Sequence, residues 1–559
     1  MTWPRTAYIT GRLPQTRDVS SYVWALWWVA RQVTHLGIPW FTSHMAAPAG
    51  IALGYDTTMP LLGVMMAPVT LIFGPSVSFT LLAIVTPGVA SYAMYRAARL
   101  WLPSTAGAIA AGTFFGLSAM LTWQDWYHLN IAAGSVFLPL ALESAVRLRR
   151  DPSARRGVVL GLVIGASALV NQQSAVLAVI MAALAVGPSL LRGPAARFKA
   201  VAAGAVTAAV VASPQVIAML QQALAGGNVV PADQLASTYG QFVASVPGLF
   251  APSPRVASYG LAGLGSIYRS PAPGDALATF GLLLSALAAA GLAARWRQRT
   301  AWLLALVWLG CAALALGPVL YVGSREFVPF AHIWHGLRES PVMPYTWFVR
   351  IPGLSSFREA DRFALAGLAG AALLAGAAVD WLRRHAWPMI IAVAILGAAE
   401  AGWSGSGGPS AMPAALPAAD RPIAADRSGS IVVDVPFGLR GGITPLYGDP
   451  ISPSALVIAT ADGHPRAVSY TSWVPAPTIA AVKSHPFYVG LVAAQDGGTN
   501  TAAQIAAARR DLSALRAGWV LVWERRPGGA LVRYLSATGF GPGYRADGVW
   551  VFRAGAYGS

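Results

Sequence analysis

The 559-residue sequence is poor in charged residues, contains only two lysines and has a single cysteine. Charged residues make up 11% of the chain and apolar residues 55%, with a mean hydropathy of +0.55. These values exclude an ordinary soluble domain and predict a polytopic membrane protein. The lone Cys311 excludes an intrachain disulfide. The net charge of +17 does not indicate a nucleic-acid partner, because arginine, alanine and glycine enrichment with little lysine is typical of GC-rich coding.

About ten apolar stretches are long enough, or nearly so, to cross about 30 Å of hydrocarbon, and the charges between them set their limits. The stretches at 157–172 and 173–191 are separated only by the polar turn Asn171-Gln172-Gln173. We therefore predict an α-helical polytopic membrane protein with spans at 76–96, 104–122, 129–146, 157–172, 173–191, 199–220, 277–294, 300–321, 363–382 and 387–403.

Basic residues occur in alternate connections between these spans. The positive-inside rule puts such connections on the cytoplasmic side, where their charge also contacts anionic inner-leaflet lipid. If two of the spans were one, or if one span were absent, some of these basic connections would lie on the outer side of the membrane. The outer segments are then 1–75, 123–128, the Asn171 turn, 221–276, 322–362 and everything after about 404. The basic residues are Arg96, Arg99, Arg147, Arg149, Arg150, Arg155, Arg156, Arg192, Arg197, Lys199, Arg295, Arg297, Arg299, Arg383 and Arg384.

The outer N-terminal segment 1–75 has no apolar span before it, and its start does not resemble a signal peptide. We therefore expect a first transmembrane helix to be missing from this start. In the alternative, residues 59–74 span the membrane and reverse every later loop, but their prolines favour an interfacial or re-entrant helix. Residues 19–41 predict a second surface helix with headgroup-level rings at Trp24, Trp27, Trp28 and Trp40.

The composition changes after Trp403, which ends the transmembrane domain at 76–403. A linker of small residues is expected at 404–429. Buried strands are expected at 431–435, 519–523 and 549–552, and a helix at 501–515 with Asn500 or Thr501 as N-cap. These elements predict an extracytoplasmic α/β domain at 430–559.

Several short motifs give the chain a resemblance to a known superfamily. They are an acidic residue in the first outer loop, the segment Phe73-Gly74-Pro75, the segment 126–130 (WYHLN) and the segment 357–363 (FREADRF). Together with the many apolar helices and the C-terminal domain, they resemble the GT-C superfamily of polyprenyl-phosphate-sugar-dependent membrane glycosyltransferases. The similarity is to the bacterial YfhO-like and mannosyl- or arabinosyltransferase-like members.

The resemblance implies a catalytic role for Asp18 in that first loop. A carboxylate there would accept the proton of an acceptor hydroxyl, or would bind a divalent metal ion such as magnesium or manganese. No second acid pairs with it, since Arg17 precedes it and Ser20 follows at the paired position, so the cofactor is left open. The alternative is that Asp18 caps the helix that starts near Val19. Secondary acidic candidates are Asp56 and Asp125, each with a turn, cap or interfacial role as its alternative.

Other polar residues predict contacts to the donor or the sugar. Arg358 and Arg362, four residues apart, would bind the donor phosphate from one helical face, with Arg350, Arg338 and Arg269 adding charge. Pairing with Glu359 or Asp361 is the alternative. His128 and Asn171 are candidate sugar contacts, with ordinary hydrogen bonding as the alternative. The C-terminal residues that suit acceptor recognition or packing are His464, Arg466, Tyr470, Trp473, His485 and Tyr488.

The sequence therefore favours an integral membrane glycosyltransferase of the bacterial inner (plasma) membrane. It would move a sugar from a polyprenyl-phosphate donor to an extracytoplasmic glycan, lipid or protein acceptor of the cell envelope. The alternatives are a transporter or flippase of lipid-linked intermediates and a non-catalytic envelope assembly protein. A transporter would be expected to carry charged or broken helices near mid-membrane, often in repeated halves, whereas the predicted spans are nearly charge-free and unrepeated.

Overall fold

Contacts divide the chain into two compact units. Unit 1 comprises Met1–Thr6, Leu81–Ala212 and Pro231–Gly408, and unit 2 comprises Ala7–Thr80, Ser213–Val230 and Pro409–Ser559. The computed structural model describes residues 11–190, 195–229, 242–250, 278–322, 325–330, 332–333, 339–351, 353–354, 357–403, 411–414, 417–441, 444–523 and 526–555.

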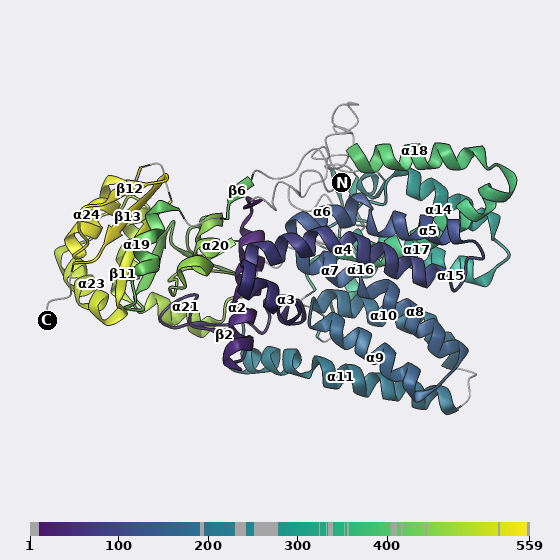
Figure 1. Ribbon diagram of the computed structural model, residues 1–559, viewed down its shortest axis with the longest axis horizontal. Coiled ribbons are helices and arrows are strands. Elements are labelled where there is room, and N and C mark those ends of the chain that lie inside the picture. Colours follow the sequence, from purple (N-terminus) through teal and green to yellow (C-terminus); the bar gives the residue numbers. More distant parts are fainter. Residues whose placement is uncertain are drawn as a thin grey trace. The chain divides into compact units, whose positions relative to one another are not determined.

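Unit 1 is a helical bundle (Figure 1), and its helices lie on the predicted apolar stretches except for α16 and the end of α6, which fall in predicted connections. The predicted break at the Asn171 turn is confirmed, because one helix ends at Ala168 and the next begins at Gln172. Two of the helices, α4 and α11, continue into unit 2. The helices are α4 (Pro75–Ala98), α5 (Thr105–Gly116), α6 (Ala119–Tyr127), α7 (Leu129–Ser135), α8 (Phe137–Arg150), α9 (Ala154–Ala168), α10 (Gln172–Leu190), α11 (Ala195–Leu224), α14 (Leu282–Ala294), α15 (Arg299–Ala315), α16 (Pro344–Phe348), α17 (Phe363–His385) and α18 (Pro388–Trp403).

Five helical segments in the described part of the chain are long and apolar enough to cross a bilayer. They are α4, α7 with α8, α10, α11 and the segment that contains α17, and a sixth is added if α5 and α6, bent by 46°, form one span. Shorter apolar helices include α14, α15 and part of α18. The predicted membrane class is confirmed, and the number of crossings stays a prediction.

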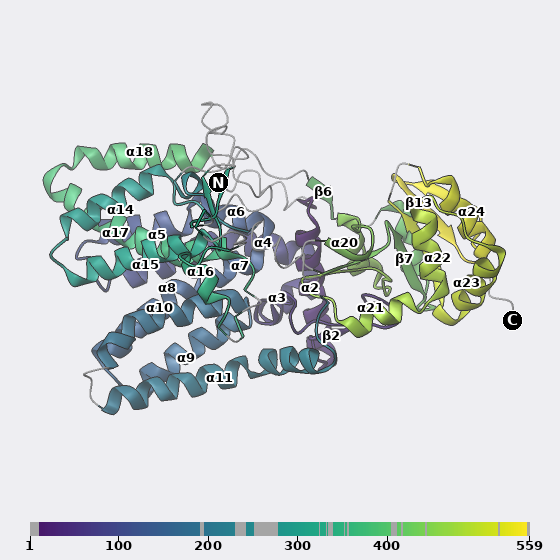
Figure 2. The same ribbon diagram turned by 180° about the vertical axis from the view of Figure 1, so that it is seen from behind.

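The helix α17 is the core of unit 1. Every residue from Phe363 to Asp380 is buried, and α5, α14 and α15 pack around it, as Figures 1 and 2 show. Small residues make this close approach possible: a Cβ added at Gly291 of α14 would lie 1.8 Å from the carbonyl oxygen of Leu374. Such small-residue contacts are how helices associate where lipid removes the hydrophobic driving force.

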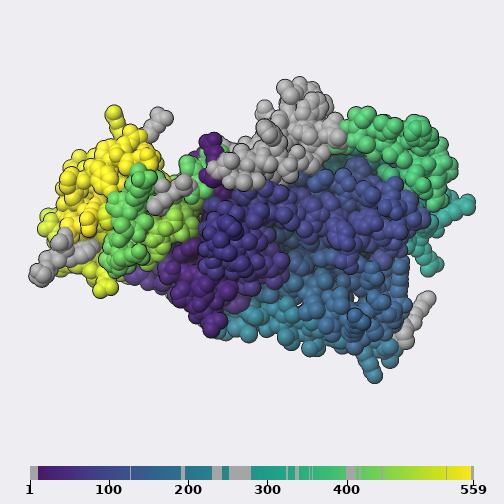
Figure 3. Space-filling view, viewed as in Figure 1, coloured from purple at the N-terminus to yellow at the C-terminus, as the bar shows by residue number. Residues whose placement is uncertain are grey.

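The outer helices of unit 1 expose apolar side chains. Val206 and Val210 on α11 are 64% and 65% exposed, and Ile395 on α18 is 63% exposed. These helices form the blue and green outer surfaces of unit 1 in the space-filling view (Figure 3). A soluble protein would bury most of this apolar surface, whereas lipid solvates it.

Unit 2 joins the N-terminal segment, the end of α11 and the C-terminal segment. Its main sheet has the order β12-β13-β11-β7, with β11 parallel to β7 and antiparallel to β13, and a second sheet has the order β10-β8-β9. The strands are β1 (Arg12–Pro14), β2 (Phe41–Thr42), β3 (Ile51–Ala52), β6 (Ala411–Pro413), β7 (Ile431–Val435), β8 (Gly438–Gly441), β9 (Thr444–Gly448), β10 (Ser469–Thr471), β11 (Ala517–Val522), β12 (Tyr544–Ala546) and β13 (Val549–Arg553). The helices are α2 (Arg17–His35), α3 (Pro60–Phe73), η5 (Ala418–Asp420), α19 (Arg421–Ala425), α20 (Pro453–Asp462), α21 (Ala476–Lys483), α22 (Pro486–Gln495), α23 (Ala502–Leu515) and α24 (Gly529–Thr538).

The predicted α/β elements of the C-terminal segment are confirmed. Strands β7, β11 and β13 fall on the three predicted stretches, and α23 falls on the predicted helix. Of the two N-cap candidates, Thr501 is the cap: its hydroxyl accepts from the backbone N–H of Gln504, whose side chain bonds back to the Thr501 N–H.

Part of the predicted linker is regular structure. Strand β6 pairs antiparallel with β1, and Ala419 of η5 and Ile423 of α19 are buried. The apolar side chains of Ala419 and Ile423 pack beneath the main sheet, which is why this stretch is ordered despite its small residues. Residues 404–410 of the predicted linker lie outside the described residues.

The N-terminal helix α2 lies in the core of unit 2, packed against α3 and α20. Trp24 and Trp28 are only 1% and 5% exposed and stack on each other with ring centroids 5.6 Å apart. The expectation that these two rings lie at headgroup level was therefore wrong, since they are covered by protein. Trp40 donates a hydrogen bond from Nε1 to Oε1 of Gln215, at 2.8 Å.

The N-terminal and C-terminal segments of unit 2 are held together by direct hydrogen bonds. The backbone N–H of Ala47 donates to the carbonyl oxygen of Arg466 at 3.0 Å. The hydroxyl of Tyr488 donates to the carbonyl oxygen of Ala47 at 2.8 Å. Segments packed in this way lie on the same side of a membrane. The sequence predicts one common side for both segments, and which side it is stays a prediction.

Candidate functional site

Asp18 lies in the first turn of α2. Thr16 is the N-cap of this helix, and its hydroxyl accepts from the backbone N–H of Val19 at 3.1 Å. The alternative that Asp18 itself caps the helix is therefore wrong. The residue is partly exposed and lies in the first turn of the helix.

Asp18 belongs to a polar cluster that also contains Tyr470, Arg440 and Asp56, called the Asp18 cluster below. The hydroxyl of Tyr470 on β10 donates to Oδ1 of Asp18 at 3.1 Å. Arg440 is the register partner of Tyr470 on the parallel strand β8, and its guanidinium carbon lies 3.9 Å from the centroid of the Tyr470 ring. Around Asp18 the cluster therefore places a hydroxyl donor and a cation.

The ionisation of Tyr470 follows from its surroundings. Burial, and next the negative charge of Asp18, raise its pKa well above the ordinary value of 10.0, although Arg440 acts in the opposite direction. Tyr470 therefore keeps its proton at neutral pH and remains a hydrogen-bond donor. The phenol fixes one oxygen of the Asp18 carboxylate in position.

The secondary candidate Asp56 is 5% exposed and lies in the same unit. Its Oδ1 accepts from the backbone N–H of Ser472 at 2.9 Å. Burial raises its pKa above the ordinary value of 3.8, although hydrogen bonds from Ser472 and Thr57 and the charge of Arg440 act in the opposite direction. Asp56 thus joins the first outer loop to the strand that carries Tyr470.

The arginine pair belongs to unit 1, and its geometry corrects the sequence prediction. Residues 357–359 are not helical and Ala360–Arg362 form a 3₁₀ helix, so Arg358 and Arg362 do not share one α-helical face before α17. Arg358 lies 3.8 Å from Glu359, and Arg362 donates to Oε1 of Gln173 at 3.1 Å. The Gln173 amide in turn donates to Glu359.

This arginine cluster of Arg358, Glu359, Arg362 and Gln173 is buried, with exposures of 7% and 9% for the two arginines. Burial alone would raise the pKa of Glu359, but the guanidinium groups of Arg362 and Arg358 and the amide of Gln173 hold it below its ordinary value of 4.5. The pairing alternative is therefore present in the structure, and part of the positive charge is already neutralised.

Of the arginines expected to support this pair, only Arg350 lies within the described residues. Arg350 lies 3.8 Å from Glu339 and over the ring of Trp347. Arg338 and Arg269 lie outside the described residues.

The other unit 1 candidates have structural contacts. Asn171 is 3% exposed, and its Oδ1 accepts from the backbone and hydroxyl of Ser174 at the start of α10, which is a helix-capping role. Asp125 is fully buried on helix α6, so its expected place in a short surface loop was wrong. Nδ1 of His128 lies 2.9 Å from Oε1 of Gln124.

The C-terminal polar and aromatic residues mostly serve packing. His464, Tyr488 and Arg466 are 5%, 0% and 0% exposed, and Nδ1 of His485 lies 2.9 Å from Asp511. Tyr470 differs, because it contacts Asp18. Within the described residues, no group of three or more His, Cys, Asp or Glu side chains is positioned to hold a metal ion.

Arg440 was not among the site residues predicted from the sequence, and no contact between Tyr470 and Asp18 was predicted. These residues are more than 400 positions from Asp18 and come from different strands. The sequence signal that could have indicated Arg440 is its positive charge in a segment that the charge pattern predicts on the outer face.

A second group of buried charges lies around Arg466 in unit 2, with Asp420, Asp434 and Asp462. Arg466 lies 3.5 Å from Asp434 and also pairs with Asp462. Asp420 is fully buried, and neither of its oxygens makes a hydrogen bond within the described structure. Burial raises the pKa of Asp420 to about 7, the charges of Asp462 and Asp434 acting in the same direction and that of Arg466 against it.

Comparison with known proteins identifies the fold. No protein-family model and no curated protein matches the chain. Among solved structures, the arabinofuranosyltransferase AftD from mycobacteria is similar with a TM-score of 0.59 and 16% identity over 99% of this chain and 41% of that chain. ArnT from Cupriavidus metallidurans is similar with a TM-score of 0.50 and 11% identity, over 99% of this chain and 98% of that chain.

A second ArnT structure, bound to undecaprenyl phosphate, gives the same TM-score of 0.50. The chain therefore has the fold shared by AftD and ArnT, which is the GT-C fold expected from the sequence resemblance. It spans about two fifths of the length of AftD and nearly all of ArnT. At these identities the likeness establishes the fold.

Proposed function

We propose that the chain transfers a sugar from a polyprenyl-phosphate donor to a hydroxyl group of an extracytoplasmic cell-envelope acceptor. The observation that carries this proposal is the GT-C fold with a partly exposed aspartate of the first outer loop held in place by a tyrosine. The undecaprenyl phosphate in the ArnT structure supports the donor class. The apolar surface and basic connections of unit 1 support a multi-pass protein of the inner membrane.

In the proposed reaction Asp18 is the general base. It takes the proton of the acceptor hydroxyl as that oxygen bonds to the anomeric carbon of the sugar. The bond from the anomeric carbon to the phosphate oxygen breaks, and its electron pair leaves with the polyprenyl phosphate. Tyr470 donates its hydrogen bond to one carboxylate oxygen, so it orients Asp18 for the transfer.

The leaving phosphate needs a cation. Arg440 supports this role because its guanidinium lies over the Tyr470 ring in the Asp18 cluster, and guanidinium groups bind phosphate oxygens in a bidentate geometry. The sequence favours Arg358 and Arg362 for the same role. Their bonds to Glu359 and Gln173 favour a second role, in which they hold the start of α17 in place.

The test compares the purified full chain with its Asp18→Asn variant in lipid nanodiscs. Polyprenyl-phosphate pentose and hexose donors are supplied with cell-envelope acceptor fractions, and release of polyprenyl phosphate is measured. We expect the variant to lose about 10²–10⁴-fold in turnover, the usual range for removal of a general base. The control is Asp496→Asn, an exposed aspartate of the same unit.

Equal turnover of wild type and Asp18→Asn would rule out Asp18 as the base. Movement of the intact lipid-linked sugar across the membrane, without cleavage of its phosphate bond, would instead identify a flippase.

A further inference from the structure

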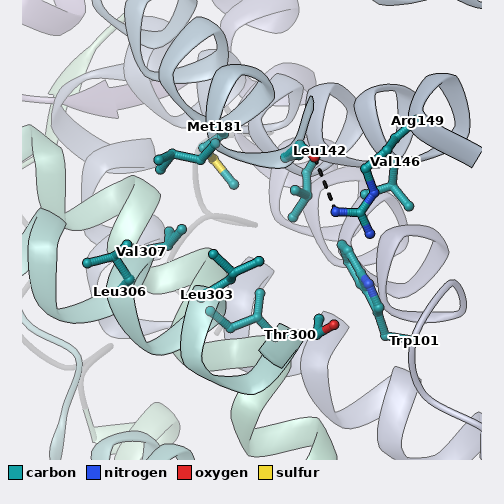
Figure 4. Close-up of a pocket in the computed structure, with 13 residues that line it drawn as sticks. Trp101, Leu142, Val146, Arg149, Met181, Thr300, Leu303, Leu306 and Val307 are labelled. Atoms are coloured by element: carbon teal, nitrogen blue, oxygen red, sulfur yellow. Dashed lines mark hydrogen bonds between the residues drawn. The ribbon is translucent and has the colours of Figure 1, made fainter. Parts of the chain in front are cut away.

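Unit 1 contains an apolar cavity between α8, α10 and α15, with its floor at Gly370 of α17. Leu142, Met181, Leu303 and Val307 line its walls (Figure 4). Leu303 is 37% exposed, so the cavity opens toward the outer surface of the helical bundle. This surface is apolar, and lipid is therefore the solvent at the opening.

One end of the cavity is polar. Figure 4 shows Arg149 and Trp101 side by side at that end, with Thr300 nearby, while Met181 and Val307 lie toward the other end. A charged group beside an aromatic ring and a hydroxyl is the arrangement found at the headgroup level of a membrane.

Arg149 carries a positive charge that no carboxylate within the described residues pairs with. Its Nη1 donates to the carbonyl oxygen of Ala185 at 3.3 Å, and no carboxylate in the described part of the chain makes an ion pair with it. The nearby Glu143 is already shared by Arg96 and Arg147, each at 2.9 Å. A guanidinium has five N–H donors, so Arg149 retains capacity for an anion.

Other arginines add to the positive potential at this end. Nη2 of Arg197 donates to the backbone oxygen of Arg149 at 3.2 Å. Nη2 of Arg150 donates to the backbone oxygen of Leu100 at 2.7 Å. These residues belong to connections that the positive-inside rule places in the cytoplasm. The polar end therefore faces the cytoplasmic leaflet in the proposed orientation.

We propose that this cavity binds an anionic phospholipid of the cytoplasmic leaflet. The lipid phosphate accepts hydrogen bonds from the Arg149 guanidinium at the polar end, and one acyl chain enters the apolar part beside Leu303. An inorganic phosphate or nucleotide would leave the apolar walls unfilled. A net-neutral phospholipid also has a phosphate, but its headgroup would bring a second positive charge to the arginines at this end. The site belongs to unit 1 and does not depend on the proposed transfer reaction.

The test uses native mass spectrometry of the full chain with phosphatidylglycerol, with phosphatidylcholine as the neutral lipid and inorganic phosphate as the headgroup alone. We expect phosphatidylglycerol to bind wild type more tightly than phosphatidylcholine, and Arg149→Gln to weaken phosphatidylglycerol binding about tenfold, the scale of a hydrogen bond to a charged group. Arg155→Gln is the matched control, since Arg155 is an exposed arginine of the same basic connection. It should change binding less than twofold.

A second variant tests the acyl-chain part of the site. Leu303→Trp fills the opening without changing charge, and we expect it to weaken phosphatidylglycerol binding while the thermal unfolding temperature in detergent stays within a few degrees of wild type. The proposal is overturned if phosphatidylcholine binds as tightly as phosphatidylglycerol, if Arg149→Gln binds like wild type, or if inorganic phosphate alone competes fully.

Discussion

Asp420 provides a test of how burial controls charge in unit 2. Its carboxyl group is fully buried without a hydrogen-bond partner in the described structure, and burial raises its pKa from 3.8 to about 7. Between about pH 4 and pH 7 the folded state therefore holds a proton that the unfolded state has lost. Because the folded state binds more protons, the free energy of unfolding falls as pH rises through this window.

The magnitude follows from the pKa difference. A shift of about 3 units corresponds to about 4 kcal/mol at pH 8, at about 1.4 kcal/mol per unit. This is an upper limit, since water penetration and relaxation around the charge reduce it. The perturbation is Asp420→Asn, which keeps the shape of the side chain and cannot ionise. We expect it to stabilise unit 2 by about 1–3 kcal/mol at pH 8 and to have little effect near pH 4.

The assay is hydrogen exchange of the β7 and β11 amides in the full chain, with variant and wild type compared at the same pH so that intrinsic exchange rates cancel. The exposed Asp496→Asn is the control and should show no pH-dependent difference. If Asp420→Asn destabilises these strands more at pH 8 than at pH 4, then Asp420 is ionised and stabilised by Arg466, and the reasoning from burial is refuted.

Three further predictions test the site, the packing and the orientation. Tyr470→Phe should lower transfer by about tenfold while Asp18 remains able to act, because only the bond that orients the base is lost; an unchanged rate would contradict the positioning role. Gly291→Val should destabilise the helical bundle by more than about 2 kcal/mol in thermal unfolding, since its side chain meets the backbone of α17; native stability would show that the helices separate without cost. In a Cys311→Ala background, a cysteine at position 496 should react with a membrane-impermeant thiol reagent in intact cells and one at position 155 should not; the reverse result would invert the proposed topology.

The sequence determined the membrane class and the helix positions for a simple reason. Hydrocarbon accepts only long apolar segments whose backbone groups are satisfied internally, so composition and local charge mark them without any knowledge of packing. The strands β7 and β13 and the capped helix α23 were also readable, since their signals lie within a few residues of one another. Helix α17 was predicted as a span like the others, and its complete enclosure was not visible in its composition.

The candidate site could be predicted from the sequence only in part. The sequence directed attention to Asp18, but its partners Tyr470 and Arg440 come from a domain at the other end of the chain. The prediction for Arg358 and Arg362 failed in its geometry because it assumed a regular helix, whereas Glu359 and a 3₁₀ turn gather the charges differently. Spacing along a sequence predicts neighbours only where the local conformation is known.

What the sequence by itself determined was that the apolar helices suit lipid and that the C-terminal segment folds as α/β structure, while the membrane face of each connection stays a prediction. Only the tertiary structure decided that the first outer segment and the C-terminal segment form one unit, with Trp24 and Trp28 in its core and Tyr470 bonded to Asp18. Hydrophobicity is a property of each residue, whereas a hydrogen bond across more than 400 residues exists only once the chain has packed.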